Sequence, residues 1–133
     1  MKILTLILIS LLIVVPQSFA GEETPEDGLK VILVLYKEKN FEKLIKERYT
    51  EIYKAEEIGK VNELIQKFSK RFSNEKKLNQ VIAVFESLVN VKPDIVVNHK
   101  PRITETDKMA KFPIKNGVFK LYLQKNGKWG FHM

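Results

Sequence analysis

The sequence contains no cysteine, and this absence excludes several classes of site at once. Without thiols there is no disulfide scaffold, no Cys-ligated zinc or iron–sulfur centre, no thiol nucleophile and no acylated lipoprotein cysteine. Gly-rich phosphate loops, zinc-protease helices and Gly-x-Ser-x-Gly elbows are also missing. The only two histidines, His99 and His132, lie far apart in the chain. We therefore expect neither a metal site nor a cofactor.

The composition is that of one folded domain. The 133 residues are 44% hydrophobic and 29% charged, which excludes a disordered tail. The formal net charge of +7 raises the question of nucleic acid. However, the lysines alternate with glutamates along the predicted helices, as on a solvated surface. Together with the predicted export described next, this pattern argues against a nucleic-acid partner.

Residues 1–20 are typical of a secretory signal peptide. Lys2 supplies a positive charge, residues 3–15 are apolar apart from Thr5 and Ser10, and Ser18 and Ala20 are small residues before a cut at Gly21. The apolar stretch of 13 residues is shorter than the roughly 20 that a membrane span needs. We predict export, most consistent with a bacterial periplasm, and no membrane span after cleavage. An uncleaved anchor is the alternative.

Residues 21–133 are predicted to form a single domain that begins with helices. Apolar residues recur at spacings of three and four, and Thr24, Asn40 and Asn74 are suited to cap the helices that follow them. A further amphipathic stretch covers residues 61–72 after Gly59. Pro93 ends the helical part, because the residue before a proline is disfavoured in helical geometry.

After Pro93 the apolar period changes to two, which predicts strands over residues 94–98, 108–114, 118–124 and 128–133. A two-residue turn at Asn116-Gly117 would place Phe112 opposite Leu121. A three-residue loop at 125–127, with Gly127 left-handed, would place Leu123 opposite Trp129. A slip of one residue would turn a whole strand to the wrong face, so this second register is favoured.

These registers give the sheet an apolar face and a basic face. The apolar face is predicted to hold Ala110, Phe112, Ile114, Phe119, Leu121, Leu123, Trp129, Phe131 and Met133. The outer face is predicted to hold Lys111, Lys120, Tyr122, Lys128 and His132, a candidate surface for an anionic partner. Because the helices must cover the apolar face, the predicted fold class is α+β, with N-terminal helices packed on one face of a mainly antiparallel C-terminal sheet.

A second group of candidate residues lies on the helices. Tyr49 and Tyr53 are four residues apart and are candidates to line a pocket or its rim, together with Glu51 and with Arg48 as an anion anchor. Glu47 and Glu51 also share a helix face, but neighbouring basic residues favour a solvated surface over acid–base chemistry. His99 is predicted to lie in a solvated loop, and His132 on the exposed side of the last strand.

Helices followed by a sheet whose last hairpin contains Asn126-Gly127-Lys128-Trp129 resemble the nuclear-transport-factor-2-like superfamily, the cystatin-like α+β cone. The resemblance extends over roughly residues 24–133, and the extra helix directly before the sheet departs from it. Members of that superfamily include enzymes, carrier domains and binding modules, and the enzymes commonly place an Asp–His or Tyr–Asp pair inside the cone. The inward strand positions of this chain hold no such pair, so no catalytic residue transfers.

We therefore predict an exported binding or interaction module without recognisable catalytic machinery. Its partner would be a small ligand or an envelope protein, and the chain would be a monomer or a small homo-oligomer. One alternative is a cone-pocket enzyme of the isomerase or hydrolase type that uses Tyr49, Tyr53 or Glu51. Another is an inhibitor or immunity-like factor that binds through the basic sheet face.

Overall fold

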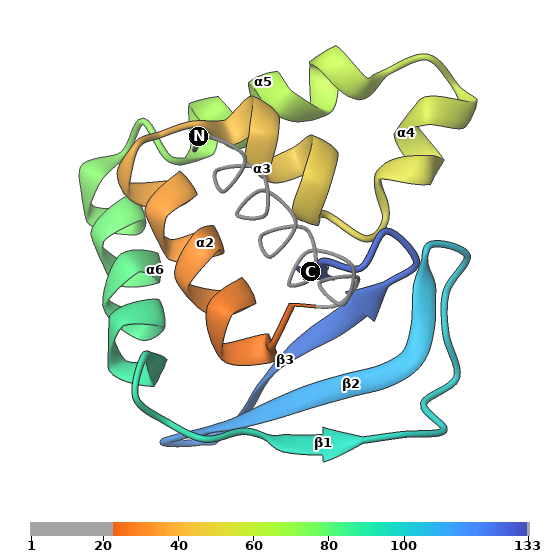
Figure 1. Cartoon of the computed structure of the whole chain (residues 1–133). Coiled ribbons are helices and arrows are strands. Elements are labelled where there is room, and N and C mark those ends of the chain that lie inside the picture. The colour runs from red at the N-terminus through yellow and green to blue at the C-terminus, as the bar shows by residue number, and fades with distance from the viewer. Residues whose placement is uncertain (1–22, 133) are drawn as a thin grey trace, which may run out of the picture.

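The computed structural model describes residues 23–132, which form five helices followed by a four-stranded antiparallel sheet (Figure 1). The helices are α2 (Pro25–Lys37), α3 (Phe41–Arg48), α4 (Ile52–Glu57), α5 (Val61–Arg71) and α6 (Glu75–Leu88). The strands are β1 (Asp94–Val96), β2 (Glu105–Ile114), β3 (Gly117–Gln124) and β4 (Trp129–Gly130), in that order across the sheet. The predicted α+β class is confirmed, whereas the predicted signal peptide lies outside the described residues.

Side-chain caps fix three of the helix starts that the sequence predicts. The side chains of Thr24, Asn40 and Asn74 each accept a hydrogen bond from the backbone N–H three residues later, at 3.1, 3.3 and 3.1 Å. Such bonds satisfy donors that the first turn of a helix leaves unpaired. The helix that follows Asn40 ends at Arg48, and α4 begins only at Ile52. Residues 49–51 form a short break between the two helices.

The second hairpin has the predicted register. Leu123 pairs with Trp129, and Gly127 adopts a left-handed φ of 82° in the three-residue loop. The predicted first turn is wrong, because Ile114 pairs with Gly117 and Phe112 faces Phe119, so that residues 115–116 form the loop. This register differs from the predicted one by two residues. A shift of two keeps every side chain on its face, so the apolar pattern alone does not distinguish the two turns.

The predicted apolar face forms one side of the core. Phe112 and Leu121 are fully buried, and α2 contacts both β3 and β4. Trp129 packs so closely on α2 that a Cβ at Gly28 would lie 2.7 Å from the Trp129 Cβ, so this contact requires glycine. The prediction fails for Ile114, which is 40% exposed because it lies at the tip of the hairpin. Met133 lies outside the described residues.

The helical cover is rich in aromatic side chains. Tyr36 of α2 packs against rings from four other segments, namely the start of α3, the end of α5, α6 and the C-terminal strand region, at centroid distances of 5.4–6.4 Å. Phe131 contributes the ring from the C-terminal end. In the part of the chain that is described, no helix has the length and apolar character needed to cross a bilayer.

The loop before β4 provides a test of the observed register. Replacing Gly127 with Ala should lower the free energy of unfolding by about 1 kcal/mol, because a Cβ disfavours the left-handed backbone. Gly127→Asn should lose less, since asparagine tolerates this conformation better. Denaturant unfolding of both variants measures the difference. Equal stability of wild type and Gly127→Ala would contradict the left-handed loop.

Candidate functional site

The break between α3 and α4 pairs with the C-terminal end of the chain. The Phe131 N–H donates to the Arg48 carbonyl at 2.8 Å, and the Thr50 N–H donates to the Phe131 carbonyl at 2.9 Å. Tyr49 and Phe131 thereby form a parallel β-bridge. Because side chains alternate along extended backbone, Arg48 and Thr50 are directed away from Tyr49. Tyr49 therefore faces one side of this segment, and Arg48 and Thr50 face the other. We call residues 48–50 the linker.

Arg48 is buried in a polar clamp rather than in a pocket. It is only 3% exposed, and its guanidinium contacts both carboxylate oxygens of Glu23 and donates to the Trp129 carbonyl at 3.0 Å. The Glu23 carboxylate also accepts the Trp129 backbone N–H at 2.9 Å, and the Glu23 carbonyl accepts the indole N–H at 2.8 Å. Arg48 thus joins the N-terminal segment to β4. Arg48, predicted as an anion anchor, therefore uses its guanidinium in contacts within the protein.

Both histidines lie beside the carboxylate of Glu105, which is the first residue of β2 and is fully buried. His99 Nε2 lies 3.2 Å from Glu105 Oε1, and His132 Nδ1 lies 3.2 Å from Oε2. The Arg102 N–H donates to Oε1 at 3.1 Å. Thr50 Oγ1 lies 2.9 Å from His132 Nδ1, which connects the cluster to the linker. We call Glu105, His99, His132 and Thr50 the histidine–glutamate cluster.

An ionised carboxylate accepts hydrogen bonds but cannot donate them, so His99 presents a proton on Nε2 to Glu105 Oε1. Glu105 Oε2 accepts no hydrogen bond, and the hydrogen bond of His132 Nδ1 is to the Thr50 hydroxyl. Burial raises the pKa of Glu105, but the polar contacts with the Arg102 N–H, His99 and Thr50 and the charge of His132 outweigh it, and the net shift is downward. Burial, followed by the charge of Arg102, lowers the pKa of His132 despite the neighbouring carboxylates. Glu105 is therefore ionised and His132 neutral at pH 7.

Tyr122 stacks between the two imidazoles. Its ring lies 4.3 Å from the His132 ring and 5.2 Å from the His99 ring, and it is 93% buried on the sheet face opposite the main apolar core. None of the four hollows described for residues 23–132 is lined by either histidine or by Glu105. Both histidines lie 3.2 Å from the Glu105 carboxylate, and the described residues contain no three groups placed to hold a metal. The cluster is best explained as a stabilising network.

This network makes a pH-dependent prediction about stability. Because the folded-state pKa of His132 lies below its ordinary 6.5, the unfolded state binds the proton more readily, and the free energy of unfolding should fall as the pH drops below 6.5. Glu105, whose pKa is also lowered, adds its own loss only below about its ordinary 4.5. Denaturant unfolding between pH 7.5 and 5 isolates the histidine contribution. His132→Gln should flatten this slope, and an unchanged slope would contradict the assignment.

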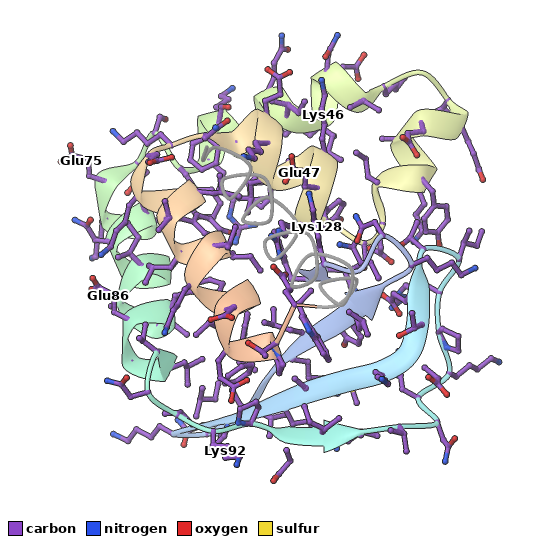
Figure 2. All side chains as sticks on the ribbon, in the orientation of Figure 1. Lys46, Glu47, Glu75, Glu86, Lys92 and Lys128 are labelled. Carbon is purple, nitrogen blue, oxygen red and sulfur yellow. The ribbon has the colours of Figure 1, made fainter. Side chains whose placement is uncertain are left out.

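The five residues of the predicted basic sheet face are not brought together as one exposed patch. Lys111 and Lys120 lie opposite each other on β2 and β3. Tyr122 is buried against His132, which belongs to the histidine–glutamate cluster. Lys128 forms an ion pair of 3.1 Å with Glu47 of α3 (Figure 2). On this face, Glu105 is a buried acid and Lys128 is paired with Glu47, which leaves Lys111 and Lys120 as the remaining basic pair.

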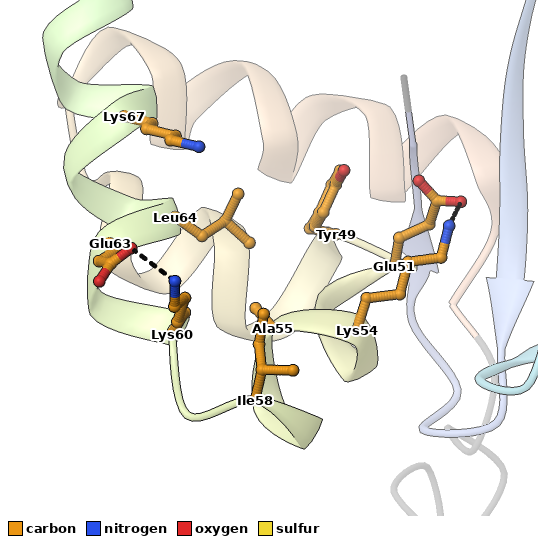
Figure 3. Close-up of a pocket in the computed structure, with 9 residues that line it drawn as sticks. All are labelled: Tyr49, Glu51, Lys54, Ala55, Ile58, Lys60, Glu63, Leu64 and Lys67. Carbon is orange, nitrogen blue, oxygen red and sulfur yellow. Dashed lines mark hydrogen bonds and ion pairs between the residues drawn. The ribbon is translucent and has the colours of Figure 1, made fainter.

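A hollow between α4 and α5 contains two of the four helix-borne candidates (Figure 3). Its volume is about 230 Å³, and Tyr49 and Glu51 line it, whereas Arg48 and Tyr53 do not. The apolar part of the lining comes from Tyr49, Ala55, Ile58 and Leu64, and the charged part comes from Glu51, Lys54, Lys60, Glu63 and Lys67. The linker thus places one predicted pocket residue, Tyr49, against the hollow. We call this feature the α4–α5 hollow.

The charges around the α4–α5 hollow are almost completely paired. Lys54 binds Glu51 at 3.0 Å, and Lys60 lies 4.0 Å from Glu63. Glu51 Oε2 also forms an ion pair with Arg102 Nη1, at 3.3 Å. Lys67 is the exception, since it has no ionic partner among the described residues, and Figure 3 shows it extending from α5 above Leu64. The hollow therefore presents one uncompensated cation beside an apolar floor.

Sequence reasoning missed the histidine–glutamate cluster. Glu105 lies between the predicted strands 94–98 and 108–114, and both histidines are predicted to face solvent. The structure instead extends β2 back to Glu105, which pairs with Gln124 beyond a register shift. The sequence could have indicated this position only by extending the pairing of the two strands backwards from Met109. The register shift between Glu105 and Met109 prevents such an extension, because its length cannot be read from the sequence.

No family model, curated protein or solved structure matches the chain. The resemblance to the nuclear-transport-factor-2-like superfamily therefore stays a prediction. The fold class rests on the helices and strands described above, and the function has to be argued from the site.

Proposed function

We propose that this chain is an exported, non-catalytic binding module that holds a small organic ligand in the α4–α5 hollow. The observation that carries the proposal is the hollow itself, in which an apolar floor is combined with a single uncompensated lysine. Ligand sites are typically concave and mainly apolar, with a few polar groups that orient the ligand. The hollow has this character on a small scale.

The lining of the hollow is held in place by the rest of the fold, which supports a preformed site. Tyr49 is fixed through the backbone pairing of the linker with Phe131, and its ring packs edge-on against Phe68 and Phe131. Leu64 packs partly against the core. A site whose walls are already ordered loses little conformational entropy when a ligand binds.

Binding without catalysis is favoured by the state of the titratable groups. The Glu51 carboxylate is already engaged by ion pairs with Lys54 and Arg102. Burial, followed by the charge of Glu51, raises the pKa of Tyr49, which keeps its hydroxyl protonated. The alternative of a cone-pocket enzyme needs an internal cavity between the sheet and the helices. Side chains of the core, among them the fully buried Leu29, Phe112 and Leu121, occupy that region. The predicted export and the superfamily resemblance belong to the same proposal.

The proposal is tested on protein recovered after export, with mass spectrometry to establish whether it begins at Gly21. Small carboxylates, alcohols and amines are added while the Leu64 methyl signals are followed by NMR. We expect saturable shifts with at least one compound. Ala55→Phe should abolish them, because the ring fills the hollow, whereas Ala83→Phe on the exposed side of α6 should not.

Two results would contradict this function. One is the absence of any saturable shift at Leu64 across the compound set. The other is equal binding in wild type and Ala55→Phe while both remain folded, because the ligand would then lie elsewhere.

A further inference from the structure

We propose that the ligand of the α4–α5 hollow is a medium-chain fatty carboxylate, with its chain along α5 and its carboxylate at Lys67. This inference rests on the proposed function and adds the chemical class of the ligand. It draws on three observations: a second hollow next to the first, the charge balance of their linings, and the apolar character of their floors.

The second hollow continues the first along α5. It has a volume of about 200 Å³ and is lined by Leu64, Lys67, Phe68 and Arg71. Leu64 and Lys67 line both hollows, so the two spaces adjoin at these side chains. Each hollow alone is smaller than the roughly 300–1,000 Å³ of a site for a drug-sized ligand. The step from Leu64 to Arg71 covers about 10 Å of helix axis. A narrow, elongated ligand therefore fits better than a compact one.

The charge balance favours a single negative charge on that ligand. In the α4–α5 hollow, both glutamates are already engaged by lysines, and Lys67 remains as the uncompensated cation. Its position where the two hollows meet allows a carboxylate to reach it from a chain lying in either direction. A cationic ligand would instead have to displace one of the existing ion pairs. A neutral ligand would gain no attraction from the charge of Lys67.

The apolar lining favours an alkyl chain as the remainder of the ligand. Leu64 and Phe68 present aliphatic and aromatic carbon along α5, and Tyr49 with Ile58 presents it from the α4 side. Apart from the tyrosine hydroxyl, these side chains offer no hydrogen-bonding group, so polar groups along the chain would lose their bonds to water. A free fatty carboxylate combines an unsubstituted apolar chain with one terminal charge, which matches this lining.

The test is isothermal titration calorimetry of the purified full chain with butanoate, hexanoate, octanoate and decanoate, all below micelle-forming concentrations. Affinity should rise about two- to fourfold per added methylene until the chain fills the hollow that it enters from Lys67. 1-Octanol is the neutral counterpart of octanoate and should bind at least threefold more weakly. Lys67→Gln should weaken octanoate about three- to tenfold, because it removes the charge-assisted contact. Lys70→Gln is the matched control, since it removes the same charge from α5 outside both hollows, and should leave affinity unchanged.

Three results would overturn the inference: equal affinity for 1-octanol and octanoate, equal loss in Lys67→Gln and Lys70→Gln, or no dependence on chain length. Anionic phosphatidylglycerol vesicles form a further arm. Tight vesicle binding without binding of free carboxylates would mean that the surface meets a membrane and would also overturn the inference. If another compound shifts the Leu64 methyl signals, the proposed function survives and only the ligand class is wrong. If none does, both fail.

Discussion

The short parallel pairing between the linker and Phe131 is the contact on which the rest of the structure depends. Two backbone hydrogen bonds, of 2.8 and 2.9 Å, join the break between α3 and α4 to the last residues of the chain. Alternation along this extended segment then distributes Arg48, Tyr49 and Thr50 among the clamp, the hollow and the histidine–glutamate cluster. Without the break, an α-helix continuing from α3 would put these three side chains about 100° apart around its axis and would leave Phe131 unpaired.

Buried charge secures the C-terminal region, where regular strand pairing is brief. β4 contains only two residues, yet Trp129 lies between the Arg48–Glu23 pair on one side and α2 on the other. Such a pair adds little net stability by itself, but leaving one partner alone typically costs about 3–5 kcal/mol. Glu105 plays the equivalent part at the bend of β2. The polar contacts of the two clusters therefore fix where the last strand lies, in addition to the burial of its apolar side chains.

The fold was more predictable than the site for physical reasons. Caps such as Thr24 and Asn74 act on residues three positions away, so their signal is local and was found. The left-handed Gly127 and the Leu123–Trp129 pair followed from matching apolar faces across a short loop. The first hairpin was misplaced by two residues because that shift preserves the faces. The meeting of His99 with Glu105 and His132 depends on a bend of β2 and on the linker, and neither leaves a local pattern.

The candidate pocket was partly predictable. The spacing of four residues assumes an unbroken helix that carries Arg48, Tyr49 and Tyr53 to one pocket, whereas only Tyr49 of these three lines the hollow. The break instead directed Arg48 into the clamp. The predicted basic sheet face assumed solvent on its outer side, whereas the loop before β2 brings His99 over Tyr122. In both places, long-range contacts changed the environment of correctly placed residues.

The ligand site inferred here lies between helices, away from the main sheet–helix core, and only Tyr49 connects it directly to the linker. In that arrangement the core stays closely packed, and the proposed ligand would exchange at a surface hollow. It also makes the linker pairing the common support of the clamp, the cluster and the hollow.

Amide hydrogen exchange at Thr50 and Phe131 tests this central claim most directly. If the pairing supports the whole structure, both N–H groups should exchange only through global unfolding, with the same denaturant dependence as core amides such as that of Leu121. Exchange of either amide at the rate of an unstructured chain, while Leu121 stays protected, would show that the linker and the C-terminal strand are not joined and would contradict the account.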